Sequence, residues 1–272
     1  MSPGVLTVYR WELRKLRYQK RTYLGLGAAA LVPILFVLAT HFRHRGPNDV
    51  AFGSYIHKSG LAIPLVILLF GAVWMFPLIT ALVAGDIFAS EDHNGTLKTI
   101  LTRSLERGEI FTGKAMAAAT YGVAAIFLNG TVAVIAGCIE SGFNPLQSLS
   151  GTRVSAPKAL ELVYSSFLVY LIPIFAIVCV GLLLSALTRN SAAAVVGTLM
   201  FSLLMQLIGI LPGLGGLQPY LLSTQFNAWQ GLLRTPIDWA PIVRAAWVCA
   251  LYGVPALFAS YLVFLRRDVA GG

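Results

Sequence analysis

The sequence has few charged residues, and this shortage excludes a soluble globular protein. Lysine, arginine, aspartate and glutamate together form 11% of the 272 residues, whereas hydrophobic residues form 57%. A soluble domain carries about 25% charged residues, so this chain lacks the polar surface that would keep it in water. Its apolar runs are about 20 residues long, the length at which an α-helix crosses the hydrocarbon of a bilayer. Because these runs do not alternate with polar residues at every second position, helices are favoured over a transmembrane β-barrel.

Cysteine and histidine are also scarce, which argues against a disulfide framework or a metal centre. The three cysteines are scattered in or beside apolar runs and are expected to be small core residues: Cys138, Cys179 and Cys249. The four histidines all fall in connections between the runs: His41, His44, His57 and His93. The first three could bind a metal, but no cysteine or acid completes such a site, so solvated loops are expected there.

Acidic side chains are missing from the interior of the apolar runs. Ion-coupled transporters and intramembrane proteases need ionisable or nucleophilic groups at membrane depth. All 11 aspartate and glutamate residues lie outside the runs or at their ends, so neither activity is expected. The chain also contains no GxxxxGKS/T loop that would cradle the phosphates of ATP. We therefore expect a membrane protein that is not an enzyme and that binds no cofactor itself.

What the chain does contain is a basic N-terminal segment followed by six apolar segments. Residues 1–21 are rich in lysine and arginine, and one helical face of this segment carries Val5, Leu6, Tyr9, Leu13 and Leu16. This pattern predicts an amphipathic helix lying in the membrane interface. Residues 1–272 are expected to form a single all-α transmembrane domain whose spans cover about residues 22–40, 61–85, 113–137, 162–187, 192–211 and 242–265.

The basic residues also predict the orientation of the chain. The net charge is +9, but the basic side chains cluster at the ends of the spans, which indicates membrane topology and not nucleic-acid binding. With the N-terminus inside, most of the 20 lysine and arginine residues are on the cytoplasmic side. Both termini, and the polar segment Asp86–Lys114 between the second and third spans, are then expected in the cytoplasm.

Two of the connections differ in length and character. Residues 188–191 are so few that the fourth and fifth spans are expected to form a tight hairpin. The connection from Pro212 to Pro241 is long, and its middle part mixes aromatic residues such as Tyr220, Phe226 and Trp229 with polar ones. This mixture predicts one or two short helices in the interface of the outer leaflet, with an ordered loop as the alternative.

Polar and aromatic positions inside two spans are candidates for a substrate pathway. In the second span, Phe70 and Trp74 share a helical face with Pro77, and the candidates of the fifth span fall near one another. Helix–helix packing produces such stripes more often than a pathway does, and both interpretations stay open at this point. The candidate pathway residues are Phe70, Trp74, Thr198, Phe201, Met205 and Gln206.

The Asp86–Lys114 segment is a polar island in this apolar chain. Ser90 is predicted to cap a short helix, and Gly95 permits a sharp change of direction after it. Beyond the glycine, a short apolar stripe lies beside basic residues: Leu97, Ile100 and Leu101 next to Lys98 and Arg103. Such a segment can lie in the membrane interface or dock into a groove of a cytoplasmic partner, and these residues alone do not decide between the two.

The polar island resembles the segment after the second span of type-2 ABC exporter permeases. The matching run is Asp86-x4-Glu91-x3-Gly95-Thr96-Leu97-x3-Leu101-x-Arg103-Ser104, followed by Ile110 and Gly113-Lys114. The ending Phe264-Leu265-Arg266-Arg267-Asp268 is similar to the C-terminal pattern of the same family. The chain departs from the pattern at Leu105, where a proline is frequent, which leaves the end of the short helix less defined.

The resemblance implies a fold and a role. It implies six spans with a cytoplasmic coupling helix between spans two and three, two permease subunits that pair, here as a homodimer, and two copies of a separate ATP-binding cassette ATPase. ATP and magnesium would be bound in that partner, and the chain would be the permease of an ATP-driven exporter in the cytoplasmic membrane of a prokaryote. By the resemblance, the residues that couple the chain to the ATPase are Glu91, Gly95, Thr96, Leu97, Lys98, Leu101 and Arg103.

Two other classes of function stay open from the sequence. One is a channel or lipid-scrambling bundle that works without nucleotide, and the other is a membrane anchor that recruits an enzyme. With no charged residue among the candidate pathway positions, an amphipathic or lipid-like substrate, such as a drug or peptide, is favoured over a bare ion.

Overall fold

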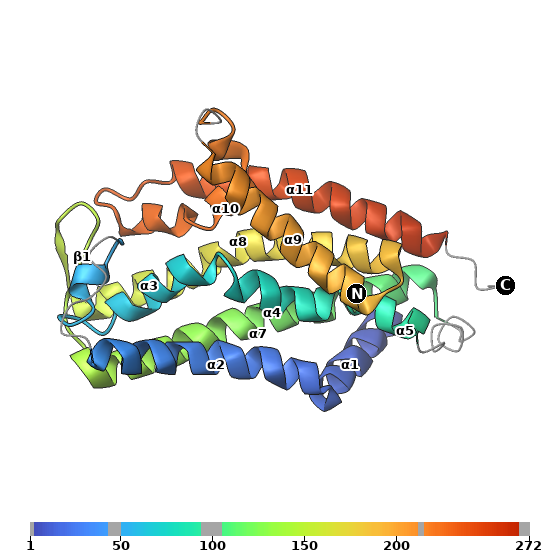
Figure 1. Ribbon diagram of the computed structural model, residues 1–272, viewed down its shortest axis with the longest axis horizontal. Coiled ribbons are helices and arrows are strands. Elements are labelled where there is room, and N and C mark those ends of the chain that lie inside the picture. The colour runs from blue at the N-terminus through green and yellow to red at the C-terminus, as the bar shows by residue number, and fades with distance from the viewer. Residues whose placement is uncertain (1–2, 43–49, 94–104, 212–214, 267–272) are drawn as a thin grey trace.

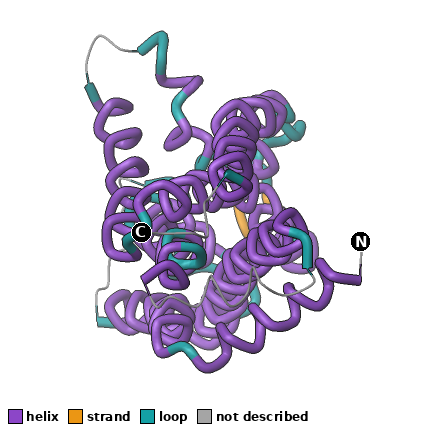
Figure 2. The backbone as a smooth tube through the Cα atoms, turned by 90° about the vertical axis from the view of Figure 1, so that its right-hand side faces the viewer, coloured by secondary structure: helices purple, strands orange, loops and turns teal. Residues whose placement is uncertain are grey.

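The computed structural model describes residues 3–42, 50–93, 105–211 and 215–266 (Figure 1). Within these residues, a bent helix pair and five helices are long and apolar enough to span a membrane, in agreement with the six spans expected. The five single helices are α2 (Lys20–His41), α7 (Arg107–Ser141), α8 (Ala156–Thr188), α9 (Ser191–Ile210) and α11 (Ala240–Leu265). Most of them run along the long axis of the molecule, and a view turned by 90° shows them nearly end-on (Figures 1 and 2).

The N-terminal helix α1 (Pro3–Tyr18) is a separate element, as predicted, and it packs at an angle to α2 against the start of α7 (Figure 1). Four of the five residues of the predicted apolar face are buried or pack against the core, and Leu6 is exposed. The buried face also includes Val8 and Glu12, which the prediction left out. The close approach of Val8 requires the glycine at position 113, where an added Cβ would lie 2.7 Å from the Cβ of Val8. Hydrophobic periodicity could not indicate that an acidic residue belongs to the buried face.

The second span is not the continuous helix that the sequence predicted. It is divided into α3 (Ala62–Gly71) and α4 (Met75–Ala84), whose axes differ by 62°. Pro77 lies in the first turn of α4, just after the break, where its missing backbone N–H costs no hydrogen bond within the helix. The break also lets the Phe76 ring fold over Gly71, where a Cβ would lie 2.6 Å from it. The helical spacing that placed Phe70, Trp74 and Pro77 on one face therefore does not hold.

The predicted hairpin between α8 and α9 is confirmed. Arg189 adopts a left-handed conformation with φ of 52°, which turns the chain sharply after α8. The Asn190 side chain then accepts a hydrogen bond from the backbone N–H of Ala193 at 3.1 Å and caps the start of α9.

The long connection before α11 contains short helical elements, as predicted: η2 (Gln218–Tyr220), α10 (Leu222–Gln225) and η3 (Ala228–Leu233). Two of its aromatic side chains are buried in the protein and do not face outward as expected at a membrane interface. Phe226 packs edge-on against Tyr170 of α8, and Trp229 stacks on Phe52, with ring centroids 5.2 and 6.4 Å apart respectively. Packing of these large rings against neighbouring elements outweighs the interfacial preference that the composition indicated.

The end of the bundle opposite α1 holds three short elements: η1 (Gly53–Tyr55), β1 (Leu146–Gln147) and β2 (Arg153–Val154) (Figure 1). The two strands pair antiparallel, and this region is called the hairpin end below. Gly60 and Gly137 lie in direct contact there, because a Cβ on Gly137 would be 2.4 Å from the carbonyl oxygen of Gly60. This contact fastens the segment before α3 to the end of α7.

The contact between Gly137 and Gly60 predicts a large difference between two glycine-to-alanine substitutions. Gly137→Ala inserts a methyl group into backbone atoms that cannot move aside, and such overpacking lowers the free energy of unfolding by about 1–3 kcal/mol. Gly27→Ala is the matched control, because no heavy atom lies within 4 Å of the added Cβ. Thermal unfolding in detergent should show a lower midpoint for Gly137→Ala only, and equal midpoints would contradict the contact.

Candidate functional site

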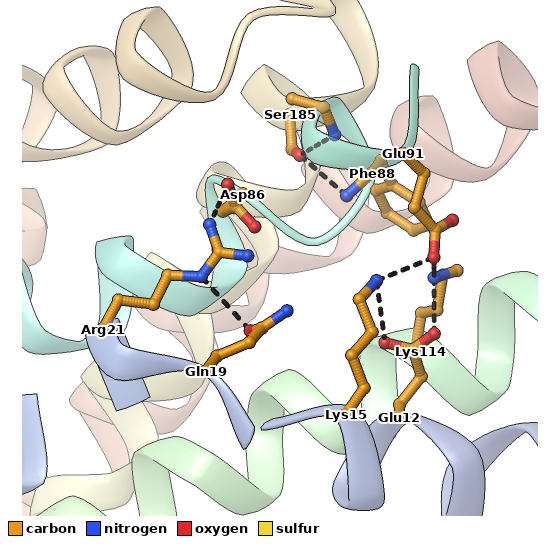
Figure 3. Close-up of polar contacts among 10 residues, drawn as sticks. Glu12, Lys15, Gln19, Arg21, Asp86, Phe88, Glu91, Lys114 and Ser185 are labelled. Atoms are coloured by element: carbon orange, nitrogen blue, oxygen red, sulfur yellow. Dashed lines mark hydrogen bonds and ion pairs between the residues drawn. The ribbon is translucent and has the colours of Figure 1, made fainter. Parts of the chain in front are cut away.

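Lys114, near the start of α7, is a buried cation placed between two buried carboxylates. Its side chain is 1% exposed, and its Nζ donates to Oε1 of Glu12 at 2.6 Å and to Oε1 of Glu91 (Figure 3). Glu12 belongs to α1, and Glu91 belongs to the short helix α5 (Ala89–His93). The Nζ of Lys15 lies 2.8 Å from the same Oε1 of Glu91. These four residues, called the Lys114 cluster, join three helices and carry two charges of each sign.

Two members of the cluster, Glu91 and Lys15, favour their charged forms. Burial opposes the charge on Glu91, but the ammonium groups of Lys114 and Lys15 outweigh burial and lower the pKa of the Glu91 carboxyl. Burial also opposes the charge on Lys15, yet the carboxylates of Glu91 and Glu12 raise the pKa of Lys15 above its ordinary value. The Glu91 contribution to stability is thus present above the ordinary pKa of glutamate and is lost as the pH falls through the lowered value. The Lys15 contribution is present below the ordinary pKa of lysine and is lost as the pH rises through the raised value.

A second buried carboxylate connects the ends of three other helices. Asp86, just after α4, is 4% exposed and forms an ion pair with Arg21 at the start of α2. The hydroxyl of Ser191, the first residue of α9, donates to the same Asp86 oxygen. The Nε of Arg21 also donates to Oε1 of Gln19 at 3.2 Å, which orients the guanidinium group (Figure 3). A single buried carboxylate therefore fixes α2, α4 and α9 relative to one another.

The chain that enters α5 is anchored by a serine from α8. The Oγ of Ser185 accepts hydrogen bonds from the backbone N–H groups of Phe88 and Ala89, both at 3.1 Å (Figure 3). The ring of Phe88 stacks on Phe111 of α7 and packs against Phe264 of α11, with centroids 5.4 and 5.0 Å apart. The start of α5 is thereby attached to α7, α8 and α11 by buried contacts.

The chain that leads into α7 is anchored as well. Glu106 and Glu109 form a reciprocal capping box at the start of α7, in which each side chain accepts from the backbone of the other. Arg107 donates from its Nη1 to the carbonyl oxygen of Leu265, at the end of α11, at 2.6 Å. Residues 94–104, which lie between α5 and α7 in the sequence, are thus flanked on both sides by residues fixed to the helix bundle.

Of the predicted coupling residues, the structure describes Glu91 and places it in the Lys114 cluster. The other six lie outside the described residues, and their roles stay predictions: Gly95, Thr96, Leu97, Lys98, Leu101 and Arg103. Ser90 does not cap a helix as predicted, because α5 begins one residue earlier. The serine that accepts hydrogen bonds from the backbone N–H groups at its start is Ser185.

The sequence did not indicate the roles of Glu12, Lys15, Asp86, Ser185 and Arg107. The one available signal was Glu12, which stands between Val8 and Leu16 at four-residue steps along α1. An acid on an apolar helical face indicates a buried partner, although it does not identify Lys114.

The candidate pathway residues are not brought together on one surface. Thr198 is buried and donates to the carbonyl oxygen of Ala194 in its own helix at 2.8 Å, and Phe201 packs against Tyr252 of α11. The backbone of Met205 accepts a hydrogen bond from Ser223 of α10. The side chain of Gln206 reaches in another direction and donates to the carbonyl oxygen of Ala72, at the bend between α3 and α4, at 3.5 Å. Phe70 and Trp74 flank that bend with 51% and 59% of their surface exposed.

Among the described residues, no three histidine, cysteine, aspartate or glutamate side chains are grouped closely enough to hold a metal ion. His41, expected in a solvated connection, ends α2, and its Nδ1 lies 2.9 Å from Oε1 of Glu140 on α7.

Comparison with known proteins gives one finding of similarity. A family model described as "ABC-2 family transporter protein" matches residues 9–206, from α1 to most of α9. A search of curated proteins found no significant match.

The burial of Lys114 predicts a strong and specific effect of its removal. Lys114→Met keeps the length of the side chain but removes the buried cation from between the two carboxylates, and Lys15, which is partly exposed, is the cation of the cluster that remains. This loss should lower the free energy of unfolding by about 3–5 kcal/mol. Adding Glu91→Gln to Lys114→Met should recover part of this loss, since one of the two carboxylates is then neutral.

The matched control is Lys158→Met, because Lys158 pairs with Glu161 at an exposed site where an ion pair contributes little. Thermal unfolding of the purified variants in detergent at neutral pH measures all three effects. If Lys114→Met were as stable as Lys158→Met, the cluster could not be the structural link described above.

Proposed function

Because the chain belongs to the ABC-2 transporter family, in which membrane-spanning subunits carry out transport, we propose that it is the permease of an ATP-driven exporter. In this proposal a separate ATP-binding cassette subunit binds and hydrolyses ATP with magnesium, and the permease converts the movement of that subunit into substrate transport. The permease itself is a multi-pass membrane protein without a catalytic role.

The observation that carries the proposal is the attachment of the Asp86–Lys114 segment to the bundle. Glu91 stands just before residues 94–104, and it contacts Lys114 on α7 and Lys15 on α1. Arg107 follows those residues and contacts the end of α11. A partner that pushes on residues 94–104 would therefore also move α1, α7 and α11, to which the flanking residues are attached.

The energetics of the cluster favour movement as a unit. Pulling a charged partner away from a buried ion pair costs about 3–5 kcal/mol, because the remaining charge stays out of water. The Asp86 carboxylate extends the connected group to α2 and α9. We infer that closure of the ATPase subunits rocks these helices together and so alternates access to the substrate pathway.

The proposed assembly is a homodimer of permeases with two ATPase subunits in a prokaryotic cytoplasmic membrane. The α1 end and both termini would face the cytoplasm, consistent with the basic residues of α1. Two helices present exposed apolar stripes that suit lipid or a second copy of the chain. The stripe on α9 consists of Val196, Met200, Leu204 and Leu207, and that on α11 of Val243, Trp247, Leu251, Val254 and Phe258.

The proposed substrate is amphipathic or lipid-like. The described spans of the bundle expose apolar and aromatic side chains, and the buried acids gather at the α1 end. The bend between α3 and α4 is the preferred place for substrate contact among the candidate positions. Phe70 and Trp74 are exposed beside it, and Gln206 reaches it from α9.

Two substitutions in the coupling segment test the proposal. Leu97→Asp or Leu101→Asp places a charge on the apolar stripe that would contact the ATPase, so each should abolish stimulation of ATP hydrolysis by substrate in the assembled complex. Insertion into the membrane should be unchanged, because neither residue lies in a predicted span. Leu217→Asp is the matched control, since Leu217 is exposed in the connection before η2, away from this segment.

Unchanged stimulation in Leu97→Asp and Leu101→Asp would remove the coupling assignment. Flux in proteoliposomes separates the other classes of function. Flux from the permease alone, without nucleotide, would indicate a channel or scrambling bundle, and co-purification with an ATPase but no ATP-dependent flux would indicate an anchor.

A further inference from the structure

A polar cavity of about 590 Å³ lies at the hairpin end, at the opposite end of the bundle from the Lys114 cluster. Its lining comes from three short segments: residues 55 and 58 at the end of η1 and just after it, residues 144, 145 and 147 at the first strand, and residues 151 and 153 at the second strand. The volume is within the range of about 300–1,000 Å³ that is usual for binding sites of small molecules. None of the described residues that are predicted to couple the chain to an ATPase or to form a substrate pathway lines the cavity.

The walls of the cavity are fixed by hydrogen bonds. The hydroxyl of Tyr55 donates to Oε1 of Gln147, and Nε2 of Gln147 donates to the carbonyl oxygen of Gly151 at 2.9 Å. The side-chain amide of Asn144 donates to the carbonyl oxygen of Lys58 at 3.1 Å. These neutral polar groups are therefore occupied by one another, and the three segments form a preformed wall.

The strand pair is itself anchored to the bundle. The backbone N–H of Leu149 donates to the carbonyl oxygen of Leu233 at 2.8 Å, and the hydroxyls of Thr152 and Thr235 are 2.9 Å apart. The hydroxyl of Ser59 donates to the carbonyl oxygen of Asn144 at 2.7 Å. The cavity thus keeps its shape without a ligand.

Two cations remain for a ligand. Arg153 lies directly opposite Gln147 in the strand pair, and the Nζ of Lys58 lies 5.2 Å from the centre of the Tyr55 ring, which holds it at the cavity wall. No acidic residue lines the cavity, and neither cation forms an ion pair with another described residue. The other cations of this region differ, because Lys158 pairs with Glu161 and Arg234 pairs with Asp238.

We propose that this cavity binds a phosphate group. Its two cations face no carboxylate in the cavity wall, and a cavity lined by charge of one sign attracts a ligand of the opposite sign. A guanidinium group binds two phosphate oxygens side by side, and an ammonium group adds a compact charge beside them. The remaining volume accommodates the organic part of a phosphate ester. The ester is either the headgroup of a phospholipid in the adjacent leaflet or a free phosphorylated molecule, and both share the chemistry that Lys58 and Arg153 recognise.

Binding of three probes to the purified protein in an uncharged detergent tests this proposal. The probes are inorganic phosphate, glycerol phosphate and the water-soluble dihexanoyl phosphatidylglycerol, titrated by calorimetry at low salt. Each of Lys58→Gln and Arg153→Gln should weaken binding of the tightest probe by at least about tenfold, since a hydrogen bond to a charged group is lost. The wild-type affinity should fall as salt is added, because both cations are exposed. Lys158→Gln removes one charge at the same end and should leave the affinity unchanged.

Each outcome of the titrations has a defined meaning. Tighter binding of the short-chain lipid than of glycerol phosphate assigns the site to a lipid headgroup, and equal or weaker binding assigns it to a free phosphate ester. Absence of saturable binding by all three probes overturns the proposal. So does an equal loss in Lys158→Gln, or wild-type affinity in variants that unfold at the wild-type temperature. The proposal is independent of the coupling role, because the titrations require neither ATP nor an ATPase.

Discussion

An ammonium group buried between two carboxylates determines how the α1 end of this protein is arranged. Lys114 is 1% exposed, and a buried charge is costly unless it is paired. Glu12 and Glu91 both contact it, so α1 and α5 have to pack against the start of α7 in one particular way. This requirement explains why the buried face of α1 contains an acid and why Gly113 admits Val8 beside it. It also explains why the start of the polar island is attached to the bundle. The proposed transmission of force through this segment depends on that attachment.

The two ends of the bundle are built from different kinds of polar contact. At the α1 end, ion pairs of buried carboxylates connect α1, α2, α5 and α7 with the end of α4, and a serine hydroxyl adds α9. These elements are therefore difficult to separate and suit movement as a unit. At the hairpin end, neutral hydrogen bonds and the contact between Gly60 and Gly137 hold short segments in place, and two cations face a cavity. In the proposed permease, the ion pairs of the α1 end would transmit the movement of the ATPase, and the cavity of the hairpin end would bind a ligand.

The sequence predicted those parts of the fold that depend on local pattern. Six apolar segments, a separate N-terminal helix and the tight hairpin at Arg189 follow from hydrophobic length and turn chemistry, and the structure contains them. The bend at Pro77 was missed although proline was noticed, because the apolar run continues through it without a polar residue. The pairing of Glu12 with Lys114 could not be predicted from the sequence, since these residues are 102 positions apart and hydrophobic periodicity carries no information about charge pairs. Similarity to a family singled out Glu91, but only the structure shows which side chains it contacts.

Residues 94–104 are proposed to receive an ATPase subunit and to pass its movement to the bundle through Glu91 and Arg107. Photo-crosslinking in membranes tests directly whether the ATPase subunit contacts this segment. A photoreactive amino acid is placed at position 97 and, as control, at position 217, just before η2. The account predicts that position 97 captures an ATP-binding cassette subunit, identified by mass spectrometry, and that position 217 does not. Capture at position 217 alone, or no capture at position 97 in an active complex, would contradict it.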